Sequence, residues 1–366
     1  MSVKICHLTI TTQNNIPRLL KESKSAVEYG MEVHIIALGK TEEKDGIHFW
    51  GIDVPANRIE RLFKTDKEVL HAAITVDADI YQLHDPELLR FVRLLKNKGK
   101  KVIFDSHENY TLQISVKEYL PRFVAKFASR IYQRLETWAL KYVDIALIPC
   151  TFEGKDIFEG RVAKHIILPN YPVLKEANEY NPHGQKICYA GALSKGRGLS
   201  NLLQAAHCSG VTLTLAGRFS SEKYQQEVMQ MPEWQSAEYL GVLPQYELFN
   251  IYSTCIAGMS TMLPTGEYRV MDTLHTKVYE YMMQGLPVIV SDFPYARRVI
   301  NEYRCGICVD PTNVQDIADA VRYLQDYPDE ARQMGQNGRK AVEREFNWGT
   351  QEKVLLKLYE ELTRVI

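Results

Sequence analysis

The sequence has no surplus of basic residues and no long apolar run, and both absences narrow its function. Its 366 residues include 44 Lys and Arg against 45 Asp and Glu, a formal net charge of −1. We expect no nucleic-acid partner, because neutralising many phosphates requires a basic surplus. No apolar stretch is long enough to span a bilayer, and no secretory signal pattern precedes the first strand-like run. These absences predict a cytoplasmic protein, at most peripheral at the inner face of the membrane.

Cysteine is scarce and scattered along the chain. The seven cysteines form an odd-numbered set, which is typical of a reducing compartment rather than of a disulfide framework. Cys305 and Cys308 have the spacing of zinc ligands or of a redox pair, but no second Cys or His pair accompanies them. We interpret this segment as a short buried strand over 306–309, and we expect no metal.

An alternation of strand and helix patterns runs along the whole chain. The composition, 45% hydrophobic and 24% charged, is that of an ordinary globular protein. The predicted strands are 3–10, 32–38, 47–52, 80–84, 101–107, 143–149 and 165–169, then 186–189, 211–216, 237–240, 255–260, 287–291 and 307–309. This order predicts an α/β protein with two doubly wound, Rossmann-like domains, 1–170 and 185–347, joined by a linker over 171–184. Ligands are expected at the carboxyl ends of the strands, in a cleft between the domains.

Two charged residues, Lys277 and Glu280, share one helical turn just before a buried strand. The pattern predicts Thr276 as N-cap, a helix over 277–284 and Gly285 as the C-terminal stop. A helix N-terminus presents unpaired N–H groups and a partial positive charge, so the loop 274–276 is a predicted seat for phosphate.

A second loop with charge and glycine spans 189–198 and lies between a predicted strand and a predicted helix. Its glycines allow close approach of a ligand, and Lys195 and Arg197 supply positive charge. The spacing is not that of a Walker motif. A glycine-containing turn between strand and helix is also common architecture, so both interpretations stay open at this point.

Taken in order, these loops carry a resemblance. The sequence reads YAGALSKGRG over 189–198, AG at 216–217, YLGVLP over 239–244 and TKVYEYMMQGLPVIVSD over 276–292. This succession resembles the donor half of the family 4 glycosyltransferases. The N-terminal segments LHDPELL (83–89) and VIFDSHE (102–108) resemble acceptor-side loops of members that build bacterial polysaccharides. The resemblance covers nearly the whole chain and implies the GT-B fold, with a last helix, about 348–366, crossing back onto the N-terminal domain.

The resemblance also implies roles for individual residues and a donor that is a nucleotide-sugar, UDP- or GDP-linked. Glu280 would hold the ribose and Asp272 would contact the donor sugar. The residues implied at the diphosphate are Gly191, Arg197, Leu274, His275, Thr276 and Lys277, and those implied at the base are Gly217 and Val242. No metal or other cofactor is implied. Three positions depart from the family pattern: Asp272 replaces the usual Glu, Ala192 replaces an Arg, and the loop 11–17 lacks a glycine pair.

His107 is the predicted catalytic residue, because it stands at the ligand-facing end of the predicted strand 101–107. The alternative is a structural histidine satisfied by Asp105 or Glu108. On the acceptor side we predict His84, Glu108 and Asn14. Asp85, which precedes Pro86, is interpreted as a helix N-cap.

These observations predict a retaining glycosyltransferase that adds a sugar to a glycan or to a polyprenyl-diphosphate-linked acceptor during bacterial surface polysaccharide synthesis. The alternatives are a nucleotide-sugar epimerase or phosphorylase of the same fold, and a catalytically silent nucleotide-sugar-binding partner of an assembly complex. The oligomeric state has no sequence signal.

The segment 117–141 has apolar residues at helical spacing, interleaved with Lys and Arg. Two interpretations stay open: a basic amphipathic helix that contacts an anionic membrane surface, and a helix packed on the core with a solvated basic face.

Overall fold

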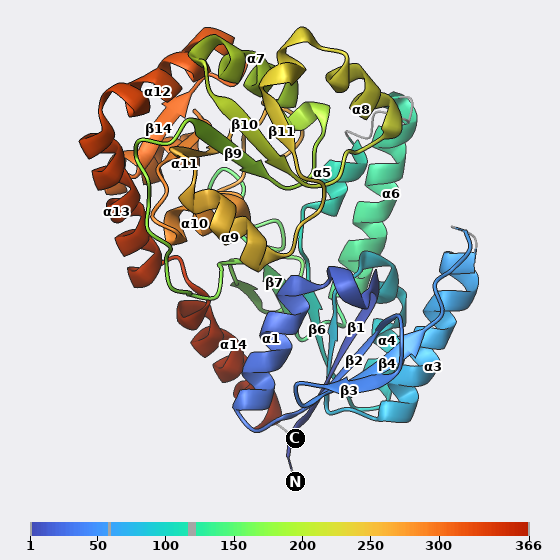
Figure 1. Ribbon diagram of the computed structural model, residues 1–366. Helices are drawn as coiled ribbons and strands as arrows, with labels where there is room; N and C mark the ends of the chain where they lie inside the picture. Colours follow the sequence, from blue (N-terminus) through green and yellow to red (C-terminus); the bar gives the residue numbers. More distant parts are fainter. Residues whose placement is uncertain (1, 58–59, 116–121, 365–366) are drawn as a thin grey trace. The chain divides into compact units, whose positions relative to one another are not determined.

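The computed structural model describes residues 2–57, 60–115 and 122–364, and the chain divides into two compact units (Figure 1). One unit is Met1–Asn170 together with Gly349–Ile366, and the other is Tyr171–Trp348. We refer to them as the N-terminal and the C-terminal domain.

The N-terminal domain is built on an eight-stranded sheet with the order β3-β4-β2-β1-β5-β6-β7-β8. All described pairings in it are parallel except that of β3 with β4. The central strands are buried on both faces, and among their apolar residues they carry the buried polar side chains of His7, Gln82 and Asp105. Its strands are β1 (Lys4–Thr12), β2 (Glu32–Leu38), β3 (Glu42–Lys44), β4 (Ile47–Ile52), β5 (Ile80–Leu83), β6 (Lys101–Asp105), β7 (Ile145–Ile148) and β8 (His165–Ile167).

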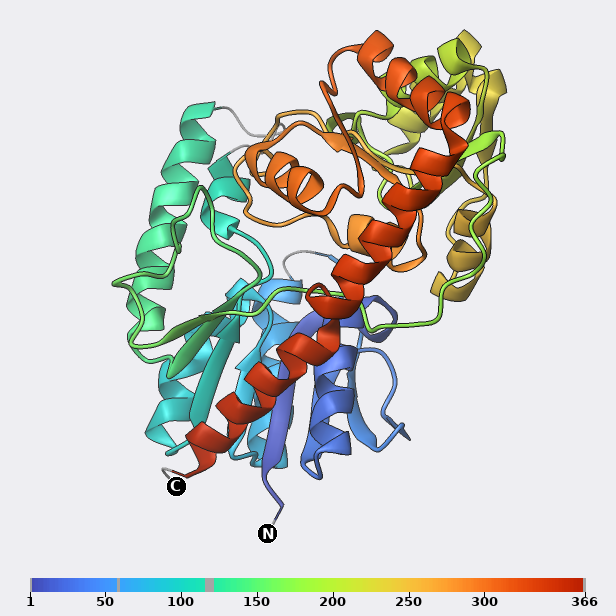
Figure 2. The same ribbon diagram turned by 90° about the vertical axis from the view of Figure 1, so that its left-hand side faces the viewer.

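The helices of this domain lie between successive strands in the chain, except for α14, which follows the C-terminal domain. They are η1 (Gln13–Asn15), α1 (Pro17–Glu28), η2 (Arg61–Thr65), α3 (Asp66–Val76), η3 (Pro86–Phe91), α4 (Val92–Asn97), α5 (Tyr110–Ser115), α6 (Arg122–Leu140) and, from the chain's end, α14 (Trp348–Thr363). Figure 2 shows α14 running along the strands and α1 of this domain. Its Tyr359 donates a hydrogen bond of 2.6 Å to Gln82 at the centre of the sheet, and its Glu361 pairs with Lys164 at 2.5 Å.

The C-terminal domain has a six-stranded, fully parallel sheet with the order β11-β10-β9-β12-β13-β14. Apolar clusters cover both of its faces. Its strands are β9 (Lys186–Ala190), β10 (Thr212–Ala216), β11 (Ala237–Tyr239), β12 (Ala257–Ser260), β13 (Val288–Ser291) and β14 (Gly306–Val309). Its helices are η4 (Lys195–Arg197), α7 (Leu199–Ser209), α8 (Glu222–Met229), η5 (Pro232–Ser236), α9 (Gln245–Ser253), α10 (Thr276–Met283), α11 (Pro294–Tyr303), α12 (Val314–Asp326) and α13 (Pro328–Arg344).

Three local predictions were wrong. The strand predicted over 101–107 ends at Asp105, so Ser106 and His107 lie in the loop beyond β6. The helix predicted after Pro86 begins as a 3-10 helix and becomes α-helical only at Val92. The antiparallel strand β3 was missed because its three residues are charged and exposed.

Each sheet reverses its strand order at one point. In the N-terminal domain, the chain leaves β1 toward β2 on one side and later returns to β5 on the other; in the C-terminal domain, β9 separates β10 from β12. Loops at the carboxyl ends of such strand pairs splay apart, which is where open α/β sheets bind ligands. None of the described helices is long and apolar enough to cross a membrane.

Candidate functional site

Two glycine turns meet at the carboxyl ends of β9 and β10. Gly191 and Gly217 have φ values of +135° and +144°, which side chains rarely allow. A Cβ atom at Gly217 would stand 1.8 Å from the carbonyl oxygen of Gly191. The two turns therefore pack backbone against backbone, with no room for a side chain between them.

Helix α10 begins beside these turns. Its N-cap is His275 rather than the predicted Thr276, which is already the first helical residue. Buried Leu274 anchors the preceding loop, and its N–H donates to the Tyr279 hydroxyl at 3.2 Å, so the helix starts one residue earlier than the polar pattern suggested. No side chain caps the first turn, which leaves its N–H groups directed out of the helix end.

Lys277 places a cation directly over this region. Its Nζ is buried, lacks a hydrogen-bond partner and lies 3.6 Å from the centroid of the Tyr189 ring. A Cβ at Gly191 would come within 3.1 Å of this atom. Burial lowers the pKa of Lys277 well below its ordinary value, the Arg197 charge lowers it further, and Glu280 opposes both. A buried amine without a partner is costly, so this position favours an anionic ligand.

Arg197, at the end of η4, is the second cation here. Its guanidinium lies 4.8 Å from the centroid of the Tyr268 ring, and one of its nitrogens is 3.3 Å from the Met262 sulfur. His275 contacts the same tyrosine ring edge-on. Burial, followed by the charges of Arg197 and Lys277, holds the pKa of His275 well below its ordinary value, so this imidazole is neutral at pH 7.

The other predicted donor-side residues lie in the same domain but are less distinctive. Glu280 accepts a hydrogen bond of 2.7 Å from Gln245, the first residue of α9. Val242, in the loop before α9, is 66% exposed, as a residue that meets a planar base would need to be. Asp272 is half-buried in the loop before α10, and Thr276 is exposed.

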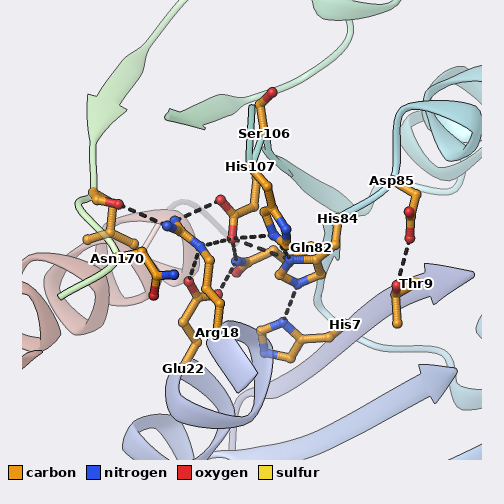
Figure 3. A network of polar contacts seen from close by, with 12 residues as sticks. His7, Thr9, Arg18, Glu22, Gln82, His84, Asp85, Ser106, His107 and Asn170 are labelled. Atoms are coloured by element: carbon orange, nitrogen blue, oxygen red, sulfur yellow. Dashed lines mark hydrogen bonds and ion pairs between the residues drawn. The ribbon is translucent and has the colours of Figure 1, made fainter. Parts of the chain in front are cut away.

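A buried polar network occupies the corresponding strand ends of the N-terminal domain (Figure 3). Asp105 accepts two hydrogen bonds from Arg18, at 2.8 and 3.1 Å, and one from Gln82 at 3.2 Å. Arg18 also pairs with Glu22 at 3.0 Å and donates to the Leu168 carbonyl at 3.1 Å. Sequence analysis named Asp105 only as a possible partner of His107 and missed Arg18 and Glu22. The signal available was an arginine and a glutamate four residues apart in one helix, with a carboxylate ending an apolar strand.

Three histidines extend from this network toward the surface. His7 Nδ1 lies 2.9 Å from His84 Nε2, and His84 Nδ1 lies 3.1 Å from His107 Nε2. His84 is 2% exposed and contacts His7, His107 and Asp105, whereas the His107 side chain is 36% exposed. Of the three, His107 is the one that a substrate can touch.

Electrostatics in the network follow from burial and from Arg18. Burial acts to raise the pKa of Asp105, but Arg18 and the neighbouring histidines outweigh it and hold that pKa well below its ordinary value. Burial lowers the pKa of His84, although Asp105 opposes the shift. Burial and the Asp105 charge raise the pKa of Glu22 to about 8. The ionised Asp105 carboxylate therefore lies beside the neutral imidazole of His84, and both are placed to orient His107.

The remaining acceptor-side predictions have different surroundings. Glu108 is exposed and contacts Gln113, and Asn14 is exposed in η1. Asp85 precedes η3 as predicted, but its side chain does not cap that helix. It accepts instead from the Thr9 hydroxyl at 2.6 Å and from the Ile10 N–H at 2.8 Å, which fixes the end of β1 to the loop after β5.

Among the described residues, two groups bring metal-ligand atoms together: His7, Glu22 and His84, and His84, Asp105 and His107. Both share their carboxylate with the Arg18 guanidinium. A cation bound in either group would lie next to that positive charge, which disfavours a metal site.

The face of α6 bears on the two interpretations of segment 117–141, of which 117–121 lies outside the described residues. Its apolar side chains are largely exposed: Phe123 by 77%, Phe127 by 66%, Ile131 by 43%, Leu135 by 61% and Trp138 by 44%. The helix packs on the domain through small and polar residues, including Ala125, Ser129, Glu136 and Ala139. The helix thus packs on the core through residues such as Ala139 and Leu140, as the second interpretation expected, but its large apolar residues do not take part and form an exposed apolar stripe.

Comparison with known proteins gives a family match and several structural likenesses. Residues 172–341 match the family model described as glycosyl transferases group 1. Comparison with curated protein sequences gives no significant match.

Solved structures similar to the whole chain include sucrose-phosphate synthase from Thermosynechococcus elongatus, with a TM-score of 0.80, 15% identity and 100% of both chains covered. HepE from Anabaena in complex with UDP-glucose has a TM-score of 0.71 at 11% identity, over 98% of this chain and 99% of that one. A UDP-forming α,α-trehalose-phosphate synthase from Burkholderia xenovorans, in complex with glucose-6-phosphate, has a TM-score of 0.68 at 12% identity, over 98% and 100%. These likenesses and the two parallel sheets confirm the predicted GT-B fold.

Proposed function

We propose that this chain is a retaining glycosyltransferase that moves a sugar from a UDP- or GDP-linked donor to a glycan or lipid-linked acceptor. The observation that carries the proposal is the buried, unpartnered Nζ of Lys277 above the Gly191 turn. An anionic group at this position would satisfy the amine, and the domain that contains it matches a glycosyltransferase family.

The C-terminal domain offers several contacts to a nucleotide diphosphate. Lys277 and Arg197 neutralise its charge, and the first turn of α10 adds N–H groups and a partial positive charge. Glu280, one turn further along α10, can accept hydrogen bonds from a ribose diol if Gln245 yields its own. The same cations stabilise the diphosphate as it leaves, which is why we propose transfer without a metal.

In the N-terminal domain, His107 would contact the transferring sugar or the acceptor hydroxyl. In the proposed step, the bond from the anomeric carbon to the phosphate oxygen breaks and the acceptor oxygen forms the new bond on the same face. The acceptor's proton passes to the departing phosphate. His107, oriented by His84 and Asp105, would donate a hydrogen bond to an oxygen of the transferring sugar or of the acceptor during this step.

The exposed apolar stripe of α6 supports a location at the inner face of a membrane. Lys126, Arg130 and Arg134 on this helix and Lys141 directly after it are exposed, and none of them forms an ion pair with another described residue. Apolar groups with basic neighbours suit an anionic lipid surface. We propose that the acceptor belongs to bacterial surface polysaccharide synthesis and is met at that surface.

A panel of nucleotide-sugars in a thermal shift assay tests the donor assignment, since a ligand that binds only the folded state raises the unfolding temperature. We expect one UDP- or GDP-sugar to raise it, and Lys277→Met to abolish the shift. Lys223→Met, at a lysine that is 88% exposed in α8, is the matched control and should retain it. The absence of any shift across the panel would overturn the proposal. Release of nucleotide that requires an acceptor separates a transferase from an epimerase and from a silent binding protein.

A further inference from the structure

A pocket of about 590 Å³ lies in the N-terminal domain, at the loops that follow β5 and β6. Pockets of roughly 300–1,000 Å³ hold small-molecule ligands. Asp85 and Glu87, which follow the buried His84, line one side of the pocket. Tyr110 and Gln113, which follow Glu108, line another side. The pocket therefore adjoins both loops that lead to the proposed acceptor side.

The pocket wall is mainly apolar and aromatic. Its apolar and aromatic members include Leu89, Tyr110, Ile114, Tyr132, Leu135 and Trp138. The rings of Tyr110 and Tyr132 lie edge to face, with their centroids 6.4 Å apart. Burial raises the pKa of both hydroxyls, so both stay neutral. Such a wall favours a ligand that presents hydrocarbon.

The charged residues of the pocket are already paired. The ion pairs are Glu136 with Arg161 at 2.6 Å, Arg61 with Glu87 at 3.2 Å, and Arg90 with Asp66. Asp85 is occupied by its bonds to Thr9 and Ile10. A charged ligand group inside the pocket would have to break one of these pairs, whereas an apolar group would not.

The pocket is continuous with the exposed stripe of α6. Leu135 and Trp138 belong to both, being wall residues that are 61% and 44% exposed. Trp138 also borders a second groove of about 270 Å³, whose other residues are Gln133, Arg134, Thr137 and Lys141. The apolar pocket thus opens past apolar residues onto a basic surface. An aliphatic chain that leaves an anionic bilayer would meet these environments in the reverse order.

We propose that this pocket binds the aliphatic chain of the acceptor, which is therefore a membrane lipid carrying a sugar rather than a free soluble sugar. The inference rests on the proposed glycosyltransferase function and assigns its acceptor class. The chain enters past Leu135 and Trp138, while Arg134 and Lys141 face the anionic surroundings. The head of the lipid then lies toward the loops of His84 and His107.

A dansyl-labelled long-chain alkyl phosphate, kept below its micellar concentration, tests the pocket on the full-length protein. We expect saturable binding by fluorescence anisotropy, with butyl phosphate and inorganic phosphate failing to compete. Ile114→Trp, which fills the pocket, should weaken binding about tenfold or more. Leu135→Ser should do the same by removing apolar wall at an exposed position that the fold tolerates.

Two matched variants control for general effects of the substitutions. Ile74→Trp in α3 and Leu94→Ser in α4 change residues that are 37% and 39% exposed and lie outside the pocket wall, so both should bind the probe normally. The nucleotide-sugar thermal shift serves as the fold check, because its residues belong to the other domain.

The outcomes separate this inference from the proposed function. Lack of saturable probe binding, or binding that neither Ile114→Trp nor Leu135→Ser weakens, overturns the pocket assignment while the donor shift persists. Equal competition by a short aromatic glycoside overturns the commitment to an aliphatic chain. Loss of the donor shift in the unmodified protein would instead overturn the proposed function.

Discussion

Arg18 in the N-terminal domain and Lys277 in the C-terminal domain both place a cation out of reach of solvent, and their surroundings are opposite. Arg18 donates hydrogen bonds to Asp105 and to the Leu168 carbonyl and forms an ion pair with Glu22. The Nζ of Lys277 has an aromatic ring on one side and no hydrogen-bond partner. Arg18 therefore has its partners within its own domain, whereas the Lys277 amine has no hydrogen-bond partner among the described residues and an anionic ligand could supply one.

The two surroundings fit two different roles, the orientation of a side chain in the N-terminal domain and the binding of an anion in the C-terminal domain. A cation whose partners are all in place suits a supporting role, such as the orientation that we propose for His107. An unsatisfied cation raises the free energy of the empty site, and an anionic ligand recovers that energy on binding. Each of the following predictions alters one side of this comparison.

The largest effect is expected from Arg18→Met. Removal of the guanidinium leaves Asp105 and Glu22 buried without their cation, which costs about 3–5 kcal/mol of unfolding free energy. Urea denaturation measures it. Arg297→Met, which removes an exposed pair with Asp292, should cost about 0.5 kcal/mol or less. Similar values for the two variants would show that the network is not the support we describe.

His107→Ala tests whether the side chain that the network orients contributes to turnover. We expect turnover to fall about 10²–10³-fold through the loss of a preorganised donor, while nucleotide-sugar affinity is unchanged. His48→Ala, at a half-exposed histidine in β4, is the control and should leave turnover intact. Full activity of His107→Ala would return His107 to the structural role considered from the sequence.

Lys277→Met should stabilise the ligand-free protein by about 1–3 kcal/mol, because it removes a buried polar group without a partner. The same change should abolish donor binding. Chemical denaturation of the empty protein and isothermal titration calorimetry with the donor measure the two effects. Destabilisation of the empty protein would mean that the amine has a partner in solution.

The smallest effect concerns pH. Glu22 has a pKa of about 8 in the folded state against an ordinary 4.5, so its contribution to stability is fully present below the ordinary value and is lost as the pH rises toward 8. The low pKa of Asp105 keeps that group ionised throughout, and the lowered pKa values of His7 and His84 act below about pH 6.5.

Between pH 7 and 8 we therefore expect the unfolding free energy to fall by about 1 kcal/mol through Glu22. Glu22→Gln should flatten this decline, and the difference between the two proteins in urea denaturation at the two pH values isolates it. A decline of the same size in both proteins would assign it to another group.

Local patterns made much of the fold predictable. Alternating apolar runs predicted the parallel strands, and Gly285 ends α10 with a φ of +70°, as its position after the helical pattern indicated. Lys277 and Arg197 could be selected because each lies near a strand pattern and a glycine in the chain. Charged β3 has no such pattern, and it was missed.

The N-terminal network was beyond local reasoning. Arg18 and Asp105 are 87 positions apart, and Tyr359 and Gln82 are 277 apart, so no window of sequence contains either pair. The pairing depends on the sheet order, which brings β1, β5 and β6 together. His107 was predicted because it ends a strand pattern, but the residues that contact it became visible only in three dimensions.

The contact of Tyr359 with Gln82 has a consequence for synthesis. The N-terminal domain draws its last helix from beyond the C-terminal domain, which is itself continuous in the chain from Tyr171 to Trp348. On the ribosome, the second domain can complete its fold while the first still lacks α14. At that stage the side-chain oxygen of Gln82 lacks the hydrogen bond that the Tyr359 hydroxyl donates in the finished protein. The chain therefore finishes the later domain before the earlier one, and truncation within 349–364 is expected to damage the domain made first.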